Sequence, residues 1–168
     1  MPEFKPREII ETLHRAGVKY VVIGGLAAAL HGADHITTDI DITPDPDVDN
    51  LERLASALDS LDAKIRSSAV PEGLAFDCSA EFLGRAQILN LTTKWGDLDV
   101  SVVPSGTHGY GDLRRDAVTI TIGDAQVAIA SLADVIRSKE AAGRAKDQLA
   151  LPTLRRLLDE GRHLGSET

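Results

Sequence analysis

The chain is poor in cysteine: among its 168 residues there is one, Cys78. A single cysteine excludes an internal disulfide and a zinc site built from several cysteines. We expect Cys78 to be a small buried side chain and not a nucleophile, because free cysteine usually packs like a small hydrophobic residue. The sequence therefore gives no indication of disulfide or zinc chemistry.

Long apolar segments are also missing. A membrane-spanning helix needs about 18 or more consecutive apolar residues, and no stretch of this chain approaches that length. Residues 1–15 are polar and amphipathic, whereas a secretory signal would be apolar there. With 43% hydrophobic and 26% charged residues, the composition is typical of a folded globular protein. We expect a soluble cytoplasmic protein with no membrane partner.

Positive charge is scarce. The formal net charge is -8 at pH 7, which argues against unspecific binding of nucleic acid, because such binding depends on lysine and arginine. Residues 1–133 carry 11 basic and 20 acidic side chains, whereas residues 134–168 carry 7 basic and 6 acidic ones. The acidic excess therefore lies ahead of residue 134.

Hydrophobic patterns along the chain predict both helices and strands. They predict a helix from Pro6 that ends before Gly17, a strand at 20–23, a helix at 26–30, a strand at 40–43, a helix opened by Asp47, strands at 88–91 and 98–102, a hairpin with strands at 118–122 and 126–129, a helix from Ser131 to Ala142, and a last helix starting at Pro152. The expected fold class is α/β (α+β), a small mixed sheet with flanking helices. We expect one domain over 1–168, with a sheet-containing core at 1–130 and C-terminal helices at 131–168.

Two aspartates lie on one face of a predicted strand. Side chains alternate along a strand, so Asp39 and Asp41 project together while Ile40 and Ile42 face the core. Carboxylates held this close repel each other unless a positive charge compensates. A divalent cation such as Mg²⁺ does so, because it prefers oxygen ligands and accepts phosphate oxygens as well. The alternative is that both aspartates cap turns or face water.

A glycine pair precedes these aspartates. Gly24-Gly25 follows a strand and opens a helix, where backbone N–H groups can meet an anion, although the pair alone is more typical of a tight turn. Gly24-Gly25, thirteen further residues and then Asp39-Ile40-Asp41 resemble the signature of the polymerase-β-type nucleotidyltransferase superfamily. The resemblance implies the nucleotidyltransferase fold and transfer of a nucleoside monophosphate from a nucleoside triphosphate such as ATP.

The resemblance also implies a third carboxylate on a later strand between apolar neighbours. Leu98-Asp99-Val100 matches that description. We expect Asp97 to lie in the turn before the strand, so Asp99 is the better candidate. Asp39, Asp41 and Asp99 would then hold Mg²⁺ or Mn²⁺, and Asp99 would act on the acceptor as base or base-positioning group.

The finer pattern resembles the minimal nucleotidyltransferases and the abortive-infection E toxin-like branch. The similarity rests on Gly-Gly-Leu-Ala-Ala, His31-Gly32, Thr37-Thr38-Asp39-Ile40-Asp41 and a tail with Ser131, Lys139, Arg144, Lys146 and Asp147. It implies that the nucleotide is bound by Gly24, Gly25, Thr37, Thr38, Lys139, Arg144, Lys146 and Asp147, with Lys139 on the phosphates. From the residues alone, Lys139 is more typical of the solvated face of a helix. Arg144, Lys146 and Asp147 could equally form an exposed charge cluster.

One position departs from the family pattern. Members commonly carry arginine four residues before the first aspartate, and this chain has His35 there. An imidazole with an ordinary pKa near 6.5 is mostly neutral at pH 7 and offers no fixed positive fork. We expect a weaker or pH-dependent phosphate contact at this position.

The acceptor is open at this level. The toxin-like branch implies RNA, such as the tRNA 3′ end, together with an antitoxin partner that restrains the enzyme. Minimal transferases of antitoxin type instead modify a protein toxin, and the acidic composition fits a protein partner better. A non-catalytic nucleotide-binding module is the third alternative, against which the repelling carboxylates argue.

Overall fold

The computed structural model describes the backbone of residues 2–166 and the side chains of residues 2–161. Within this part of the chain the strands are β1 (Tyr20–Ile23), β2 (Asp39–Pro44), β3 (Lys64–Ile65), β4 (Ile88–Thr93), β5 (Gly96–Ser101), β6 (Val118–Ile122) and β7 (Ala125–Ile129). The helices are α1 (Pro6–Arg15), α2 (Gly24–Leu30), α3 (Val48–Ser60), α4 (Ala80–Arg85), α5 (Tyr110–Arg115), α6 (Leu132–Ala142) and α7 (Ala145–Ser166). None of these helices combines the length and apolar character needed to cross a membrane.

The strands form one mixed sheet in the order β3-β4-β5-β2-β1-β7-β6. β2 pairs antiparallel with β1 and parallel with β5, and β1 pairs parallel with β7. Both central strands are therefore enclosed by other strands, and the β2–β5 pair joins segments nearly sixty residues apart in the sequence, since its register places Asp41 opposite Asp99. The predicted α/β fold with a mixed sheet is confirmed.

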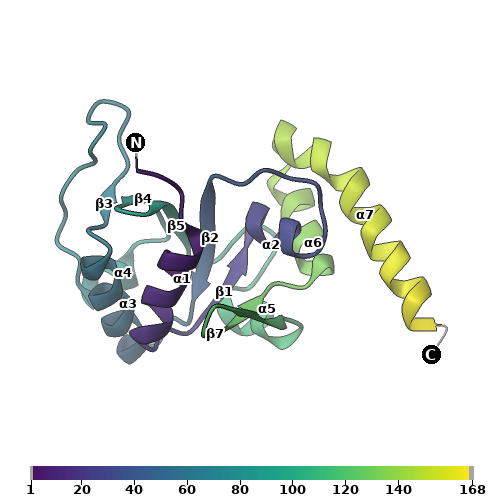
Figure 1. Ribbon diagram of the computed structural model, residues 1–168, viewed down its shortest axis with the longest axis horizontal. Helices are drawn as coiled ribbons and strands as arrows, with labels where there is room; N and C mark the ends of the chain where they lie inside the picture. Colours follow the sequence, from purple (N-terminus) through teal and green to yellow (C-terminus); the bar gives the residue numbers. More distant parts are fainter. Residues whose placement is uncertain (1, 167–168) are drawn as a thin grey trace.

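The core lies against the apolar face of the sheet. Ile40 and Ile42 of β2 are fully buried, as are Ile9 and Leu13 of α1 and Leu54 of α3. Figure 1 shows α1 and α3 side by side toward one end of the molecule, while α2 and α6 lie toward the other, with α7 beyond them. On the opposite face of β2, Thr43 is also buried, whereas Asp39 and Asp41 stay partly exposed.

The C-terminal helices differ from the prediction. Pro152 was expected to open the last helix, but α7 starts at Ala145 and contains Pro152. The earlier start follows from the preceding turn: Gly143 ends α6 in the left-handed conformation with φ 64°, and Arg144 accepts the first backbone bond of the new helix, from Gln148. Pro152 is exposed, so the backbone carbonyl it leaves without a helical partner can face water.

Two expected caps are realised to different extents. The Ser131 hydroxyl accepts a hydrogen bond from the backbone N–H of Asp134 at 3.1 Å, as predicted for the start of α6. Asp47 stands at the N-cap of α3 but makes no side-chain capping bond. Ser79 caps α4, a helix that the hydrophobic pattern did not predict, by accepting from Phe82 N at 3.1 Å.

Candidate active site

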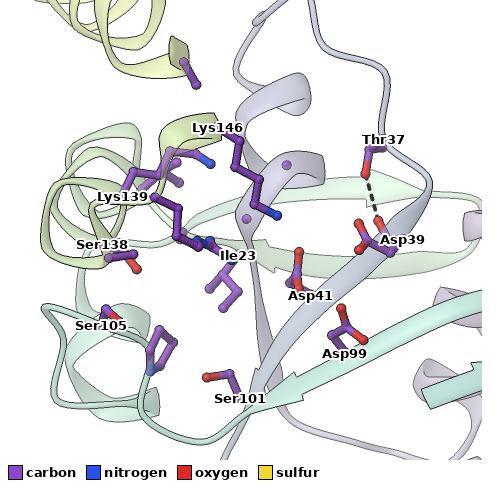
Figure 2. A pocket seen from close by; sticks show the side chains of 18 of the residues that line it. Ile23, Thr37, Asp39, Asp41, Asp99, Ser101, Ser105, Ser138, Lys139 and Lys146 are labelled. Atoms are coloured by element: carbon purple, nitrogen blue, oxygen red, sulfur yellow. Dashed lines mark hydrogen bonds between the residues drawn. The ribbon is translucent and has the colours of Figure 1, made fainter. Parts of the chain in front are cut away.

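The floor of the site forms where β2 and β5 run in parallel. Asp39 and Asp41 share one face of β2, and the register places Asp99 of β5 opposite Asp41. One carboxylate oxygen from each of Asp39, Asp41 and Asp99 lies within 4.8 Å of the others. Figure 2 shows the three carboxylates projecting into the same space. Strand alternation and parallel pairing thus bring together side chains that are distant in sequence.

This cluster is short of positive charge. Burial, together with the carboxylates of Asp39 and Asp99, raises the pKa of Asp41 to about 7. Burial likewise raises the pKa of Asp99, although the guanidinium of Arg66 opposes the shift. Converging hard oxygen donors whose negative charges are only partly balanced fit a divalent cation such as Mg²⁺ or Mn²⁺. The residues present therefore suit the predicted metal.

The cluster opens into a cleft of about 610 Å³. The described residues that line it come from strands β1, β2, β4 and β5, from helices α2, α5, α6 and α7, and from the segments before β2, after β5, after β7 and between α6 and α7. Gly24, Gly25, Thr37, Thr38, Lys139, Arg144 and Lys146 are among them. The structure thus places most of the predicted nucleotide-binding residues around one cavity with the carboxylates.

Gly24 and Gly25 allow a close approach between α2 and the β2 edge. Gly24 has φ +68°, and a Cβ there would collide with the Asp41 carboxylate. A Cβ on Gly25 would lie 2.9 Å from His35 Nε2. Close packing against Asp41 and His35 is therefore enough to require glycine at both positions, which the sequence does not reveal. The predicted phosphate contact at this turn stays a prediction.

The loop before β2 brings further predicted residues to the cleft. Thr37 donates its hydroxyl to the Asp39 carbonyl at 2.8 Å, which fixes the chain as it enters the strand. His35, Thr37 and Thr38 all line the cavity. His35 therefore lies in the lining of the cavity, at the position where members of the superfamily that the sequence resembles commonly carry arginine.

Lys139 and Lys146 lie across the cavity from the aspartates (Figure 2). The Lys139 side chain is 15% exposed, so it is not on the solvated face of α6. Its Nζ lies 3.3 Å from Asp147 Oδ1, and Arg144 Nε donates to Asp147 Oδ2 at 2.7 Å. Both lysines also lower the pKa of Asp41 against the stronger effects that raise it.

Asp147 differs from its predicted place. It is fully buried and is not among the described residues that line the cleft, so it is neither part of an exposed charge cluster nor a direct contact for a ligand there. Burial alone would raise the pKa of Asp147, but the bonds from Arg144 and Lys139 lower it. Its role in this geometry is to hold those two cations at the start of α7.

Asp97 also differs from its predicted place. It lies within β5, opposite Asp39, and not in the preceding turn. Its partner is Arg66, whose Nε lies 3.2 Å from Asp97 Oδ2. The same arginine donates Nη2 to Asp99 Oδ1 at 2.7 Å. Sequence reasoning missed Arg66, because it is 33 residues from Asp99 and belongs to no recognisable motif.

A further set of cleft residues was missed as well. These residues carry no charge and come from β4, β5 and the segment after β5: Ile88, Asn90, Val100, Ser101, Pro104 and Ser105. The segment after β5 lies against α6, since a Cβ on Gly106 would meet Ala141 and Arg137. Among the described lining residues, the lysine and arginine side chains come from α6 and α7 and the loop between them. The strands and the segment after β5 therefore contribute no cation to the described lining.

Comparisons with known proteins give fold-level similarity. No family model matches the chain, and no curated protein matches it. A solved structure of a putative nucleotidyltransferase from Thermotoga maritima is similar with TM-score 0.55 and 20% identity, covering 95% of this chain and 97% of that chain. The lincosamide antibiotic adenylyltransferase LnuA, with lincomycin bound, is similar with TM-score 0.60 and 16% identity, covering 92% and 99%.

An antigenic nucleotidyltransferase-like protein from Paracoccidioides brasiliensis is also similar, with TM-score 0.52 and 17% identity over 91% of this chain and 73% of that chain. At these identities the similarity shows the fold alone. It does not extend to the toxin-like branch. The chain has the nucleotidyltransferase fold, as the sequence predicted.

Proposed function

We propose that the chain is a metal-dependent nucleotidyltransferase that moves a nucleoside monophosphate from a nucleoside triphosphate to an acceptor and releases pyrophosphate. The observation that carries this proposal is the convergence of three carboxylate oxygens within 4.8 Å in a cleft that Lys139 and Lys146 also line. A binding module would have no chemical use for carboxylates that repel one another. The nucleotidyltransferase fold of the structural neighbours supports the same class of reaction.

Each group has a role that its position supports. Asp39, Asp41 and Asp99 would hold Mg²⁺ or Mn²⁺, which supplies positive charge to the triphosphate as its negative charge shifts during transfer. Lys139 and Lys146 contact phosphate oxygens from the α6–α7 side. The acceptor oxygen attacks the α-phosphorus, the bond to pyrophosphate breaks, and Asp99 takes or orients the proton of the acceptor hydroxyl. Thr37 and Thr38, which line the same cleft, would contact the nucleotide.

The charge distribution bears on the acceptor. RNA is held mainly through its phosphates, which requires lysine or arginine where it lies. The lining that comes from β4, β5 and the segment after β5 carries Asn90, Ser101 and Ser105 between apolar residues, and it includes no cation among the described residues. This favours an acceptor that presents a neutral hydroxyl, on a small molecule or on a protein partner. LnuA is named for adenylyl transfer to a lincosamide antibiotic, which makes ATP the first triphosphate to test and gives a precedent for a small acceptor on this fold.

The tRNA 3′ end, with a cognate antitoxin as partner, is a second proposal. It rests on the resemblance of the Gly-Gly, Asp-Ile-Asp and tail motifs to the toxin-like branch. The same resemblance supports the protein acceptor, since antitoxin members modify a toxin.

A labelling experiment tests these proposals together. The protein is incubated with Mg²⁺ and each α-labelled nucleoside triphosphate, separately with total RNA, cell protein and the small-molecule fraction of a lysate. Pyrophosphate release and the fraction that gains label are measured, and Asp41→Asn serves as the control for a contaminating activity. Label in the small-molecule or protein fraction supports the neutral acceptor, and label in RNA supports the second proposal. No label and no pyrophosphate in any set refutes the enzyme and leaves the binding module.

A further inference from the structure

Arg66 reaches the carboxylate cluster from the edge of the sheet. It directly follows β3, and its backbone N–H donates to the Asn90 carbonyl of β4 at 2.9 Å. Its side chain crosses β4, where Nη2 donates to the Leu91 carbonyl at 2.9 Å, and the same Nη2 donates to Asp99 Oδ1 on β5 at 2.7 Å. The main chain of Arg66 is therefore held by its bond to Asn90, and its guanidinium is held by the bond to the Leu91 carbonyl.

The two aspartate contacts of Arg66 are unequal. Nη2 makes a short, directed hydrogen bond to Asp99, whereas Nε lies 3.2 Å from Asp97 without meeting hydrogen-bond geometry. A charge-assisted hydrogen bond constrains the orientation of a carboxylate, while an ion pair without that geometry contributes charge and little direction. Arg66 thus orients Asp99 and only neutralises Asp97.

This contact matters because Asp99 has few other restraints. The Asp99 side chain is 17% exposed and faces the carboxylates of Asp39 and Asp41, which repel it. Without a partner, that repulsion would favour rotation of Asp99 away from the cluster. Arg66 bonds one oxygen from the side opposite β2, so the carboxylate stays at the floor of the cleft.

We propose that Arg66 is a positioning residue for nucleotidyl transfer, whose guanidinium holds the Asp99 carboxylate beside Asp39 and Asp41. The inference rests on the proposed function of this site. Arg66 is not among the described residues that line the cleft, so it acts on the reaction through Asp99 and not by contact with the nucleotide. A lysine at this position keeps the charge but replaces the rigid planar guanidinium, whose Nη2 donates to both Leu91 and Asp99, with a flexible ammonium group.

Three variants separate orientation from charge. Arg66→Lys keeps the positive charge, Arg66→Met removes it at similar length, and Arg85→Met is the control, because Arg85 is also ion-paired, at 2.7 Å to Glu81, but its side chain is 80% exposed and lies outside the cleft. The measurements are thermal unfolding, Mn²⁺ binding by calorimetry, and kcat and KM for the nucleoside triphosphate. Mn²⁺ alone is the binding probe.

Arg66→Lys is expected to lower kcat by about tenfold or more, because small misplacement of a reacting group is costly, while KM for the triphosphate stays within about twofold. Its Mn²⁺ affinity is expected to stay within about twofold of wild type, since the charge is retained. Arg66→Met is expected to lower kcat as well, and to bind Mn²⁺ about threefold or more weakly, because Asp99, one of the three proposed ligands, is no longer held beside Asp39 and Asp41. Arg85→Met should change none of these values.

Two results would overturn the proposal: a kcat for Arg66→Lys within about twofold of wild type, or an unchanged Mn²⁺ affinity in Arg66→Met. A wild-type protein that binds Mn²⁺ but transfers no nucleotide refutes the proposed function, and the Mn²⁺ measurement on Arg66→Met then decides whether Arg66 is coupled to the cluster. If the triphosphate KM rises while kcat is unchanged, Arg66 contacts the nucleotide and the positioning role is wrong.

Discussion

Replacing Asp41 by asparagine should stabilise the metal-free protein while abolishing transfer. The ordinary pKa of this carboxyl is 3.8, and burial among other carboxylates raises it to about 7 in the fold. The folded state therefore holds the Asp41 proton more tightly than the unfolded state does. Stability from this group is fully present below about pH 4 and is lost as the pH rises through about 7. Asparagine has nearly the same shape and no charge to lose.

The size of the effect follows from the pKa difference. One pKa unit corresponds to about 1.4 kcal/mol, so a shift of about three units sets an upper limit of about 4 kcal/mol. Asp41 is partly accessible from the cleft, and the three carboxylates share their charge, so the realised difference should be smaller. We expect Asp41→Asn to be about 1 to 3 kcal/mol more stable than wild type at pH 8, and the difference to shrink toward zero near pH 4.

The assay is urea unfolding of both proteins between pH 4 and pH 8 in buffer with a chelator, repeated with Mg²⁺. Mg²⁺ should raise the wild-type stability at pH 8 by mass action and should raise that of Asp41→Asn much less. Pyrophosphate release should disappear in the variant. Equal stability of the two proteins across the pH range would show that the carboxylates do not repel in the fold. A variant that keeps transfer with unchanged Mg²⁺ dependence would refute the metal site.

Three further substitutions test separate parts of the site. Lys139→Ala should weaken nucleotide binding about tenfold or more, because a charged contact to phosphate is lost. Lys94→Ala removes an exposed lysine outside the cleft and should leave the affinity unchanged. Equal affinities of the two variants in a binding titration would contradict the phosphate contact. Gly24→Ala should lower the unfolding free energy by about 1 to 3 kcal/mol, because its φ is +68° and a Cβ has no room, while Gly111→Ala, with open space around it, should be neutral in the same urea titration. Asp147→Asn should destabilise the fold by about 1 to 3 kcal/mol, since Lys139 and Arg144 lose a buried partner, and an unchanged melting temperature would show that these two ion pairs are dispensable.

The parts of the fold that were predictable depend on local patterns. Residues 118–122 are all β-branched, residues 20–23 are β-branched apart from the aromatic Tyr20, and period-two alternation in Asp39-Ile40-Asp41-Ile42 indicates which face is buried. The two-residue β3 and the six-residue α4 are too short to give a periodic signal, so the pattern missed them. Pro152 misled the prediction, because proline favours the first turn of a helix. Here it lies inside α7, at an exposed position.

The candidate site divides in the same way. Asp39 and Asp41 are neighbours in sequence, and their shared face could be predicted from alternation alone. Asp99 depended on the resemblance, because parallel pairing of β2 with β5 is a long-range feature. Arg66 and the buried position of Asp147 could not be predicted, since both depend on how side chains from distant segments meet.

The charged and the uncharged residues that line the cleft explain why the sequence indicates the nucleotide donor more clearly than the acceptor. Every nucleoside triphosphate presents the same charged phosphates, so the residues that meet them must be of few kinds, such as carboxylates with a cation and lysines, and these form a recognisable pattern. A neutral acceptor imposes no such restriction, because apolar contacts and hydroxyl groups can come from many residue types. Ser101 and Ser105, in the strand and loop beyond Asp99, carry no pattern that sets them apart from other serines. Replacing these two serines by larger side chains should therefore change which acceptor gains label while leaving triphosphate binding intact. If the variant loses triphosphate binding as much as acceptor labelling, the proposed separation of donor and acceptor residues is wrong.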